Sequence, residues 1–405
     1  MRVIDKSKAV ARRVLSPIVA AKNRARKSRL YSQLHTNLDP ARHIAEAAEW
    51  LCRAQDHGRD RGVSYGADFG TGFLPSYPET TGYIICTFLA LARRSGNQDF
   101  VKRAIEMGTW EAEIQMDSGA VMGGMYDEST PTPAVFNTGM VLLGWADLYA
   151  QTGSVRFGEA GRRAAEWLLT MQQANGEWSR CNSQFAKVGI TVYNVKAAWG
   201  LAAMGASLGE RKYIEAAVRN AEFALTKQSE NGWFSECCLS DANSPLLHTL
   251  AYAMQGLVGV GRIARRDDFI RRARRTADSL LTLMDEKGFI PGRINDKFRG
   301  TVDWCCLTGT AQTSIVWCQL ASLTGEREYH EAAARAGRYL MARHDIDNLD
   351  PSIRGGVAGS WTVYGEYGRF KTLHCATKFF IDALLAAEAS TQSKISEAAI
   401  ASASH

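Results

Sequence analysis

The sequence predicts an all-α protein, a closed (α/α)6 toroid in which six apolar helices are surrounded by six amphipathic ones. Three observations predict this fold: a repeat of about 56 residues, the alternation of two unlike helices within each repeat, and the apolar character of one of them. The chain has 405 residues, of which 46% are hydrophobic and 22% charged, so it can bury a large core.

The repeat is visible where the helical segments end. A Gly or Arg is followed four residues later by an aromatic residue, and successive aromatics lie 57, 56, 56 and 60 residues apart. The pairs are Gly96 and Phe100, Gly153 and Phe157, Gly209 and Tyr213, Arg265 and Phe269, and Gly325 and Tyr329. A second set, Gly119, Gly176, Gly232 and Gly288, keeps the same period and fits left-handed caps of helices. One repeat is therefore a helical hairpin.

Each hairpin joins two unlike helices. The first, for example RFGEAGRRAAEWLLTMQQ, carries its charged residues on one face, as a surface helix does. The second, for example MVLLGWADLYA, is apolar on nearly all sides and must be buried. Six such helices follow Glu79, Phe136, Tyr193, Leu247, Leu307 and Leu373. An open solenoid is the alternative, but its inner helices would not be so uniformly apolar.

Three segments are predicted: a basic extension over 1–37, the toroid over 38–390 and a flexible tail over 391–405. The first 36 residues hold ten Lys or Arg and one acid, Asp5, so they carry +9, and the rest carries −3. The extension has no apolar run long enough for a secretory signal or a membrane span, and Pro17 is expected to end any helix in it. It is interpreted either as an arm that contacts anionic lipid or an acidic partner, or as a solvated extension packed on the toroid.

Composition also narrows the compartment and the ligands. Nine cysteines, an odd number, without an export signal favour reduced thiols and a cytoplasmic protein. Peripheral contact with the inner membrane face through residues 1–37 is a further hypothesis. The slightly acidic body and the lack of a recognition motif argue against nucleic acid, and no nucleotide-binding glycine loop is present. No cofactor is predicted.

Polar residues begin the six apolar helices at matching positions, spaced 57, 57, 54, 60 and 66 residues apart. They are Thr80, Asn137, Asn194, His248, Thr308 and His374. In a toroid they form a ring around one end of the central cavity. Thr and Asn cap helix N-termini well, so capping is one interpretation of the ring and ligand binding is the other. Histidine caps poorly and titrates near neutrality, so His248 and His374 are predicted to do more than cap.

The loops before these helices are rich in aromatic and charged residues, and the helix N-termini add positive potential, which predicts an anionic or polyhydroxylated ligand. Candidates for stacking are Trp178, Trp233, Trp304, Trp361 and Tyr364, and candidates for holding a carboxylate are Arg180, Arg293, Arg299 and Arg369. The predicted substrate-binding set is Thr80, Asn137, Asn194, Trp304, Thr308, Trp361, Tyr364, Arg293 and Arg369.

Two mechanisms are open for a glycan. Hydrolysis needs a carboxylic acid and a carboxylate, for which Glu79, Asp127, Glu128, Asp241, Asp303 and Glu366 are available. Elimination or epimerisation at a uronic acid needs a base, an acid and cations, and Tyr193, His248, His374 and Tyr364 could transfer the protons. The predicted catalytic set is Glu79, Tyr193, His248, Asp303, His374 and Glu366. Each has a structural alternative, because loop carboxylates commonly pair with arginines.

The repeat over residues 40 to 390 resembles the six-hairpin glycosidase superfamily of hydrolases, polysaccharide lyases and uronyl epimerases. The stretches YPETTGYII, VFNTG, LLHTLAY, CLTGTAQ and YGRFKTLHCATKFFIDALL resemble, more closely, bacterial toroid proteins encoded with polysaccharide-assembly enzymes. The resemblance implies a carbohydrate-active protein of bacterial polysaccharide metabolism, with a nascent or lipid-linked glycan as its partner. A non-catalytic glycan-binding or scaffold subunit is the second hypothesis.

Two other toroid families are weaker matches. QQANGEW fits the QxxxGxW signature of terpene cyclases, but the nearest match to their DxDD cluster, DIDN at Asp345 to Asn348, lacks the last acid. Lanthionine cyclases bind zinc through Cys and His, and a comparable set here is Cys305, Cys306, His374 and Cys375. The order of the motif differs, so these cysteines are interpreted as buried thiols and no metal is predicted.

Overall fold

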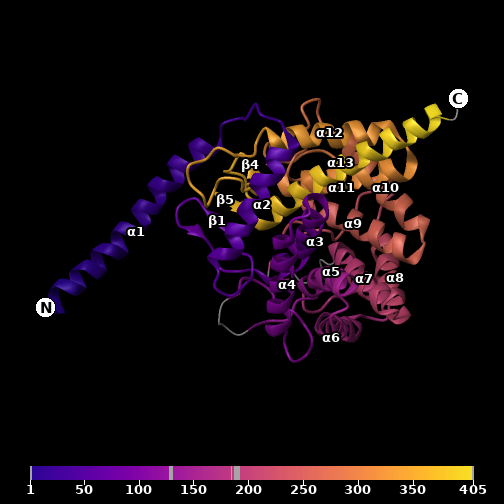
Figure 1. The fold of residues 1–405 in the computed structure, drawn as a ribbon, viewed down its shortest axis with the longest axis horizontal. Helices are drawn as coiled ribbons and strands as arrows, with labels where there is room; N and C mark the ends of the chain where they lie inside the picture. The colour runs from indigo at the N-terminus through magenta and orange to yellow at the C-terminus, as the bar shows by residue number, and fades with distance from the viewer. Residues whose placement is uncertain (1, 127–130, 184, 187–191, 404–405) are drawn as a thin grey trace.

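The computed structural model describes residues 2–126, 131–183, 185–186 and 192–403, and in them helices of two kinds alternate (Figure 1). The inner helices are α3 (Pro78–Ser95), α5 (Val135–Thr152), α7 (Val195–Leu208), α9 (Leu247–Ala264), α11 (Leu307–Thr324) and α13 (His374–Ala403). The outer helices are α2 (Pro40–His57), α4 (Gln98–Glu113), α6 (Val155–Met171), α8 (Arg211–Thr226), α10 (Asp267–Leu283) and α12 (Arg327–Met341). A short 3-10 turn, η1 (Val192–Asn194), leads into α7. The six predicted hairpins are confirmed.

The inner helices form a closed ring. Each packs on the next in chain order, and the last, α13, packs on the first, α3. At this closure the rings of Tyr83 and Phe379 lie 5.5 Å apart, and Thr87 donates a 2.8 Å hydrogen bond from its hydroxyl to Asp382. The fold is therefore the predicted (α/α)6 toroid and not an open solenoid.

Small residues let the inner helices approach closely. The Cβ that an alanine would add at Gly200 in α7 lies 1.9 Å from the carbonyl oxygen of Gly139 in α5. Gly144 in α5 meets the carbonyl oxygen of Gly82 in α3 in the same way, at 2.1 Å. These close approaches pack α3 against α5 and α5 against α7 backbone to backbone.

The predicted left-handed caps occur at the first set of positions. Gly96, Gly153, Gly209, Arg265 and Gly325 end inner helices with φ between 55° and 72°. The second set of glycines is placed differently from the prediction. Gly119 lies six residues after α4 ends, in a turn with φ of 91°. Glycine is required at this position because any side chain would strike the carbonyl oxygen of Arg163. These glycines are needed for turns that pack against the next outer helix.

Two small antiparallel sheets cover the end of the ring where the inner helices begin. In the first sheet the strand order is β2 (Gly72–Phe73), β1 (Gly66–Asp68) and β5 (Lys371–Leu373), with Ala67 opposite Thr372. The second sheet pairs β3 (Cys305–Cys306) with β4 (Ser360–Trp361). β5 leads directly into α13 and β3 into α11, so the sheets fix the starts of two inner helices.

The helix α1 (Arg2–Tyr31) precedes the ring and stands out from it (Figure 1). The prediction that Pro17 ends a helix is wrong, because α1 continues through it; a proline removes one backbone hydrogen bond, which a long helix can lose without ending. At the other end, α13 continues to Ala403, so the backbone of residues 391–403, expected in a flexible tail, is helical. Among the described residues no helix is both long and apolar enough to cross a membrane.

The close approach of α5 and α7 gives a stability prediction. We expect Gly200→Ala to lower the free energy of unfolding by about 1–3 kcal/mol, because its methyl group would overlap the Gly139 carbonyl. Gly337→Ala is the matched control in α12, where the added methyl group meets only Leu384 at 3.8 Å, and it should raise stability by about 0.5–1 kcal/mol. Urea unfolding followed by circular dichroism measures both, and a Gly200→Ala protein as stable as wild type would contradict this packing.

Candidate active site

A cavity of about 220 Å³ opens where the inner helices begin. Its lining comprises Tyr65, Tyr77, Glu79, Thr80, Tyr83, Phe136, Ser183, Phe185, Tyr193, Leu239, His248, Thr249, Tyr252, Tyr367, His374 and Cys375. The cavity therefore combines aromatic walls with one carboxyl group and two imidazoles.

Glu79 is the only carboxyl group among the described lining residues. Pro78 starts α3, so Glu79 lies in the first helical turn, and its Oε1 accepts a 3.5 Å hydrogen bond from the hydroxyl of Tyr83. Burial raises the pKa of Glu79 to about 7, although hydrogen bonds from Tyr77 and Tyr83 act in the opposite direction. At neutral pH this carboxyl group can therefore both accept and donate a proton.

His374 begins α13 and is a neutral hydrogen-bond donor. Its Nδ1 accepts a 2.8 Å hydrogen bond from the backbone N–H of Cys375, and burial lowers its pKa to about 3. A neutral imidazole that accepts at Nδ1 carries its proton on Nε2. This Nε2 is buried and has no partner among the described residues, so it can donate to an oxygen of a ligand in the cavity.

His248 is the second residue of α9, and burial, with a contribution from Arg293, lowers its pKa to about 3. Its Nδ1 lies 3.9 Å from the Sγ of Cys306, and its ring lies 4.4 Å from that of Tyr367. In the order of the six inner helices α9 is three positions from α3. Glu79 and His248 therefore begin opposite helices of the ring and face the cavity from two sides.

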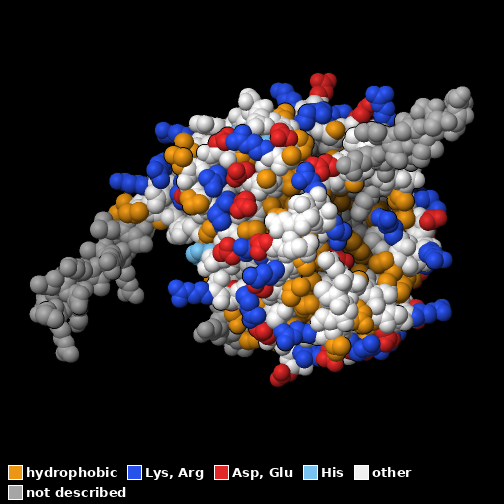
Figure 2. Space-filling model, viewed as in Figure 1, with side chains coloured by type: hydrophobic (Ala, Val, Ile, Leu, Met, Phe, Trp, Pro, Cys, Tyr) orange, Lys and Arg blue, Asp and Glu red, His pale blue; other side chains and the backbone are white. Residues whose placement is uncertain are grey.

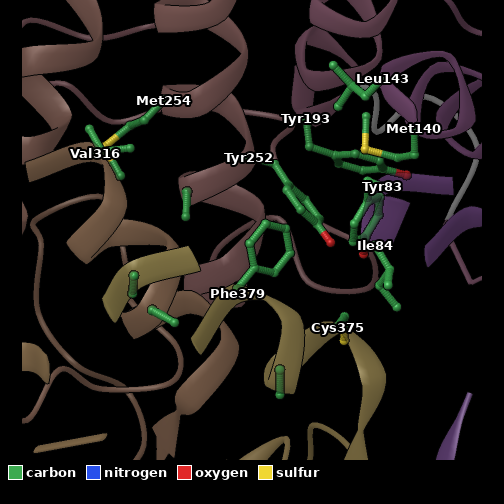
Figure 3. Packing of buried hydrophobic residues seen from close by; sticks show 14 of the residues in the cluster. Tyr83, Ile84, Met140, Leu143, Tyr193, Tyr252, Met254, Val316, Cys375 and Phe379 are labelled. Atoms are coloured by element: carbon green, nitrogen blue, oxygen red, sulfur yellow. The ribbon is translucent and has the colours of Figure 1, made fainter. Parts of the chain in front are cut away.

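Tyrosines form the floor and walls of the cavity. Figure 3 shows the phenol of Tyr252 reaching toward Tyr83, with Phe379 beside it. The hydroxyl of Tyr193 is buried and has no partner in the part of the chain that the structure describes. Burial raises the pKa of Tyr83, Tyr193 and Tyr252, so these phenols stay protonated and act as hydrogen-bond donors.

The polar ring is present, but its residues do not cap helices through their side chains. The N-cap positions of α3, α5 and α11 are occupied by residues outside the ring, namely Tyr77, Ala134 and Cys306. Asn194 does occupy the N-cap position of α7, but its side chain makes no capping hydrogen bond. Thr80 lines the cavity and donates to the hydroxyl of Tyr83 at 3.3 Å. Asn137, Asn194 and Thr308 are buried behind the lining, where Asn137 donates to the carbonyl of Met122 at 2.9 Å.

Of the predicted site residues, the structure brings together Glu79, Thr80, Tyr193, His248 and His374 in the cavity. Outside the lining are Asn137, Asn194, Arg293, Asp303, Trp304, Thr308, Trp361, Tyr364, Glu366 and Arg369. Arg293 and Glu366 pair with each other through hydrogen bonds of 2.8 and 2.9 Å. Asp303 and Tyr364 are exposed, Arg369 donates to the carbonyl of Tyr364, and Trp361 packs on Tyr31.

The other residues considered for ligand binding fall outside the cavity as well. Trp178 is fully buried and donates to the carbonyl of Leu168 at 2.9 Å, so it is a core residue. Asp127 and Glu128 lie outside the described residues. In the described ranges no three His, Cys, Asp or Glu side chains form a group that could hold a metal ion, so Cys305, Cys306, His374 and Cys375 do not form a zinc site there.

Five tyrosines of the cavity, Tyr65, Tyr77, Tyr83, Tyr252 and Tyr367, were not predicted from the sequence. A signal existed for two of them: Tyr83 follows Glu79, and Tyr252 follows His248, by four residues, which places each pair on one face of a helix. Tyr65, Tyr77 and Tyr367 come from loops whose placement depends on the two small sheets. No helical spacing could have indicated them.

The raised pKa of Glu79 gives a pH-dependent stability. The pKa is about 7 in the folded protein against 4.5 for an ordinary glutamate, so folding stability falls as pH rises through this interval and the loss remains at higher pH. We expect Glu79→Gln to be more stable than wild type at pH 8, by roughly 3 kcal/mol at most, and to lose this advantage near pH 4.5. Urea unfolding at both pH values measures the difference in unfolding free energy between Glu79→Gln and wild type. Glu286→Gln, at an exposed position, is the control. Equal stability at pH 8 would show that Glu79 ionises normally.

No protein-family model matches this sequence, and no curated protein is significantly similar to it. Solved structures are similar in fold. An unsaturated glucuronyl hydrolase from Bacillus sp. GL1 superposes with a TM-score of 0.65 at 14% identity, covering 86% of this chain and 96% of its own. Cellobiose 2-epimerase from Bacillus thermoamylovorans gives a TM-score of 0.67 at 10% identity, covering 84% and 96%. A D-mannose isomerase gives 0.66 at 11%, covering 86% and 96%. The chain therefore shares the (α/α)6 toroid fold of these proteins.

Proposed function

We propose that the protein is a carbohydrate-active enzyme that transfers protons at a carbon of one sugar unit bound in the cavity. The observation that carries the proposal is the convergence of Glu79, with its pKa near 7, and two neutral histidines in one cavity walled by tyrosines. The proteins with a similar fold include a sugar epimerase and a sugar isomerase beside several glycan hydrolases, so the comparisons support carbohydrate processing, and the choice of proton transfer rests on the cavity residues.

The reaction proposed is epimerisation or isomerisation next to the carbonyl group of an open-chain sugar. The carboxylate of Glu79 removes the proton from the carbon beside the carbonyl, and the electron pair of the C–H bond moves to the oxygen, giving an enediol-type intermediate. The protonated carboxyl group of Glu79 then returns a proton to the neighbouring carbon, which gives isomerisation, or to the other face of the same carbon after the intermediate has turned in the cavity, which gives epimerisation, and the carbonyl group forms again. His248, across the ring from Glu79, stays neutral and is placed to form a hydrogen bond with the sugar.

His374 has a separate role in this proposal. Its Nε2–H, free of any described partner, donates to the oxygen on which negative charge develops. A neutral imidazole at a helix N-terminus is suited to this, since the positive end of the helix disfavours the imidazolium form. The hydroxyl of Tyr193 is a second donor available to the sugar.

Hydrolysis is less well supported than proton transfer at carbon. Glycosidases need two carboxyl groups about 5–10 Å apart around the scissile bond. Glu79 is the one carboxyl group among the described residues of the lining; Asp303 is exposed, Glu366 is bound to Arg293, and Asp127 and Glu128 lie outside the described residues. The chemistry available to the described lining is therefore that of one carboxyl group and two imidazoles.

The substrate proposed is a neutral sugar, in place of the acidic glycan expected from the sequence. A uronate needs a cation beside its carboxylate, and the described lining holds no Lys or Arg. Arg293 is already neutralised by Glu366, and Arg369 lies outside the cavity. The aromatic walls suit the apolar faces of a neutral pyranose. We further propose, on the sequence resemblance, that this sugar is a free reducing sugar or oligosaccharide of bacterial polysaccharide metabolism, because a lipid-linked sugar is bonded through its anomeric carbon and has no open-chain form.

Substitution of the three ionisable residues tests the proposal. Wild type, Glu79→Gln, His248→Asn and His374→Gln would be incubated with neutral reducing disaccharides and their uronate counterparts, and the products identified by NMR. We expect wild type to convert a neutral sugar and each variant to lose 10²–10⁴-fold in kcat, the usual contribution of a positioned acid or base. His57→Gln, at an exposed position of α2, is the control and should keep full activity. Binding without conversion by wild type would favour a glycan-binding subunit.

The pH dependence of the reaction is a separate prediction. Because Glu79 must be ionised to act as the base, kcat/KM should rise with pH and level off above an apparent pKa of about 7. The histidines, with pKa values of about 3, stay neutral throughout and add no second step in this range. Stopped assays between pH 5 and 9 measure the profile. An activity that falls as pH rises through 7 would mean that Glu79 is required in its protonated form.

A further inference from the structure

Among the described side chains of the helix α1, those of its C-terminal part contact the toroid. Arg24 pairs with Asp68 at 3.0 Å and Lys27 with Asp350 at 2.6 Å. The hydroxyl of Tyr31 donates to the carbonyl of Gly356 and accepts from the N–H of Ala358, both at 2.9 Å. These contacts fix the base of α1, while the rest of the helix extends away from the ring (Figure 1).

The outer face of the described part of α1 mixes aliphatic and cationic side chains. Ile18 is 50% exposed and Val19 is 52% exposed, and Lys22, Arg26 and Arg29 are exposed on the following turns. Figure 2 shows basic and hydrophobic side chains next to each other on this part of the helix. No carboxylate in the described part of the chain pairs with these three cations. The sequence before them adds Lys6, Lys8, Arg12 and Arg13.

We propose that α1 docks onto an anionic membrane surface. A helix that carries cations beside exposed aliphatic side chains, and is too polar to span the bilayer, is typical of one that lies in the interfacial plane. The first 36 residues carry a net charge of +9, and the rest of the chain carries −3. The positive charge that an anionic membrane would attract is therefore concentrated in α1 and its junction with the ring. Ile18 and Val19 favour a lipid surface over an acidic protein, because they can insert between headgroups.

The base of α1 is joined to the cavity side of the ring. Asp68, the partner of Arg24, ends β1; β1 pairs with β5, and β5 runs directly into His374. A membrane-docked α1 therefore holds this edge of the cavity close to the lipid surface. A benefit of this position for the reaction in the cavity rests on the proposed function, whereas the docking itself does not.

Vesicle binding tests the docking. Full-length protein would be sedimented with vesicles of phosphatidylcholine alone or with 30% phosphatidylserine, at low and high salt. We expect binding only to the phosphatidylserine vesicles and a decrease with salt. Lys22→Gln/Arg26→Gln/Arg29→Gln should weaken it by roughly five-fold per cation, on the order of 100-fold in total. Ile18→Ser/Val19→Ser should also weaken it, which a purely electrostatic contact would not require.

The controls separate docking from general charge and from catalysis. Arg271→Gln/Arg275→Gln/Lys287→Gln removes three exposed cations elsewhere on the toroid and should bind like wild type. Glu79→Gln should bind vesicles fully whether or not the protein proves to be an enzyme. Equal binding by the α1 triple variant and wild type, or no sedimentation with any vesicle, would overturn the proposal; the latter result would favour an acidic protein as the partner of α1.

Discussion

The closure of the inner ring is the constraint on which the rest of the structure depends. The last inner helix, α13, meets the first, α3, where Asp382 accepts from Thr87 at 2.8 Å and pairs with Lys378 on its own helix. The side chain of Lys378 also lies over the ring of Phe379, 4.3 Å from its centroid. Only a closed ring brings α3 and α13 side by side, and so places Glu79 and His374 in one cavity. The aliphatic packing of the other inner helices supports this arrangement but does not by itself bring together residues almost 300 positions apart.

Two electrostatic effects compete at the cavity, and their sizes decide the protonation states. The helix N-termini favour a carboxylate and disfavour an imidazolium, each by about 0.3–1 kcal/mol and up to about 2 in buried geometry. Burial disfavours both charged forms, and for Glu79 the net result is a pKa of about 7. At Glu79 the effect of burial on the pKa is therefore larger than the effect of the helix N-terminus. At His374 both effects disfavour the charged form, so the imidazole stays neutral. One location thus supplies a carboxyl group that titrates near neutrality and a neutral donor.

The toroid could be predicted from the sequence because each hairpin repeats a local signal: an apolar helix, a left-handed end and an aromatic four residues later. The positions that begin the inner helices were equally visible, so Glu79, Thr80, Tyr193, His248 and His374 could be named. Residues in loops could not be placed in this way. Arg293 and Glu366 are 73 positions apart, and their pairing, which removes both from the substrate, depends on how two loops fold over the ring. Tyr65, Tyr77 and Tyr367 were missed for the same reason.

The central claim is that a carbon-bound proton of a neutral sugar is exchanged in this cavity. It is tested most directly by incubating the protein with neutral reducing disaccharides in deuterium oxide and examining the recovered sugar by NMR. The account predicts that deuterium appears at the carbon next to the carbonyl group with wild type and not with Glu79→Gln. Conversion of the sugar without deuterium, or release of a monosaccharide by cleavage of the glycosidic bond, would contradict it.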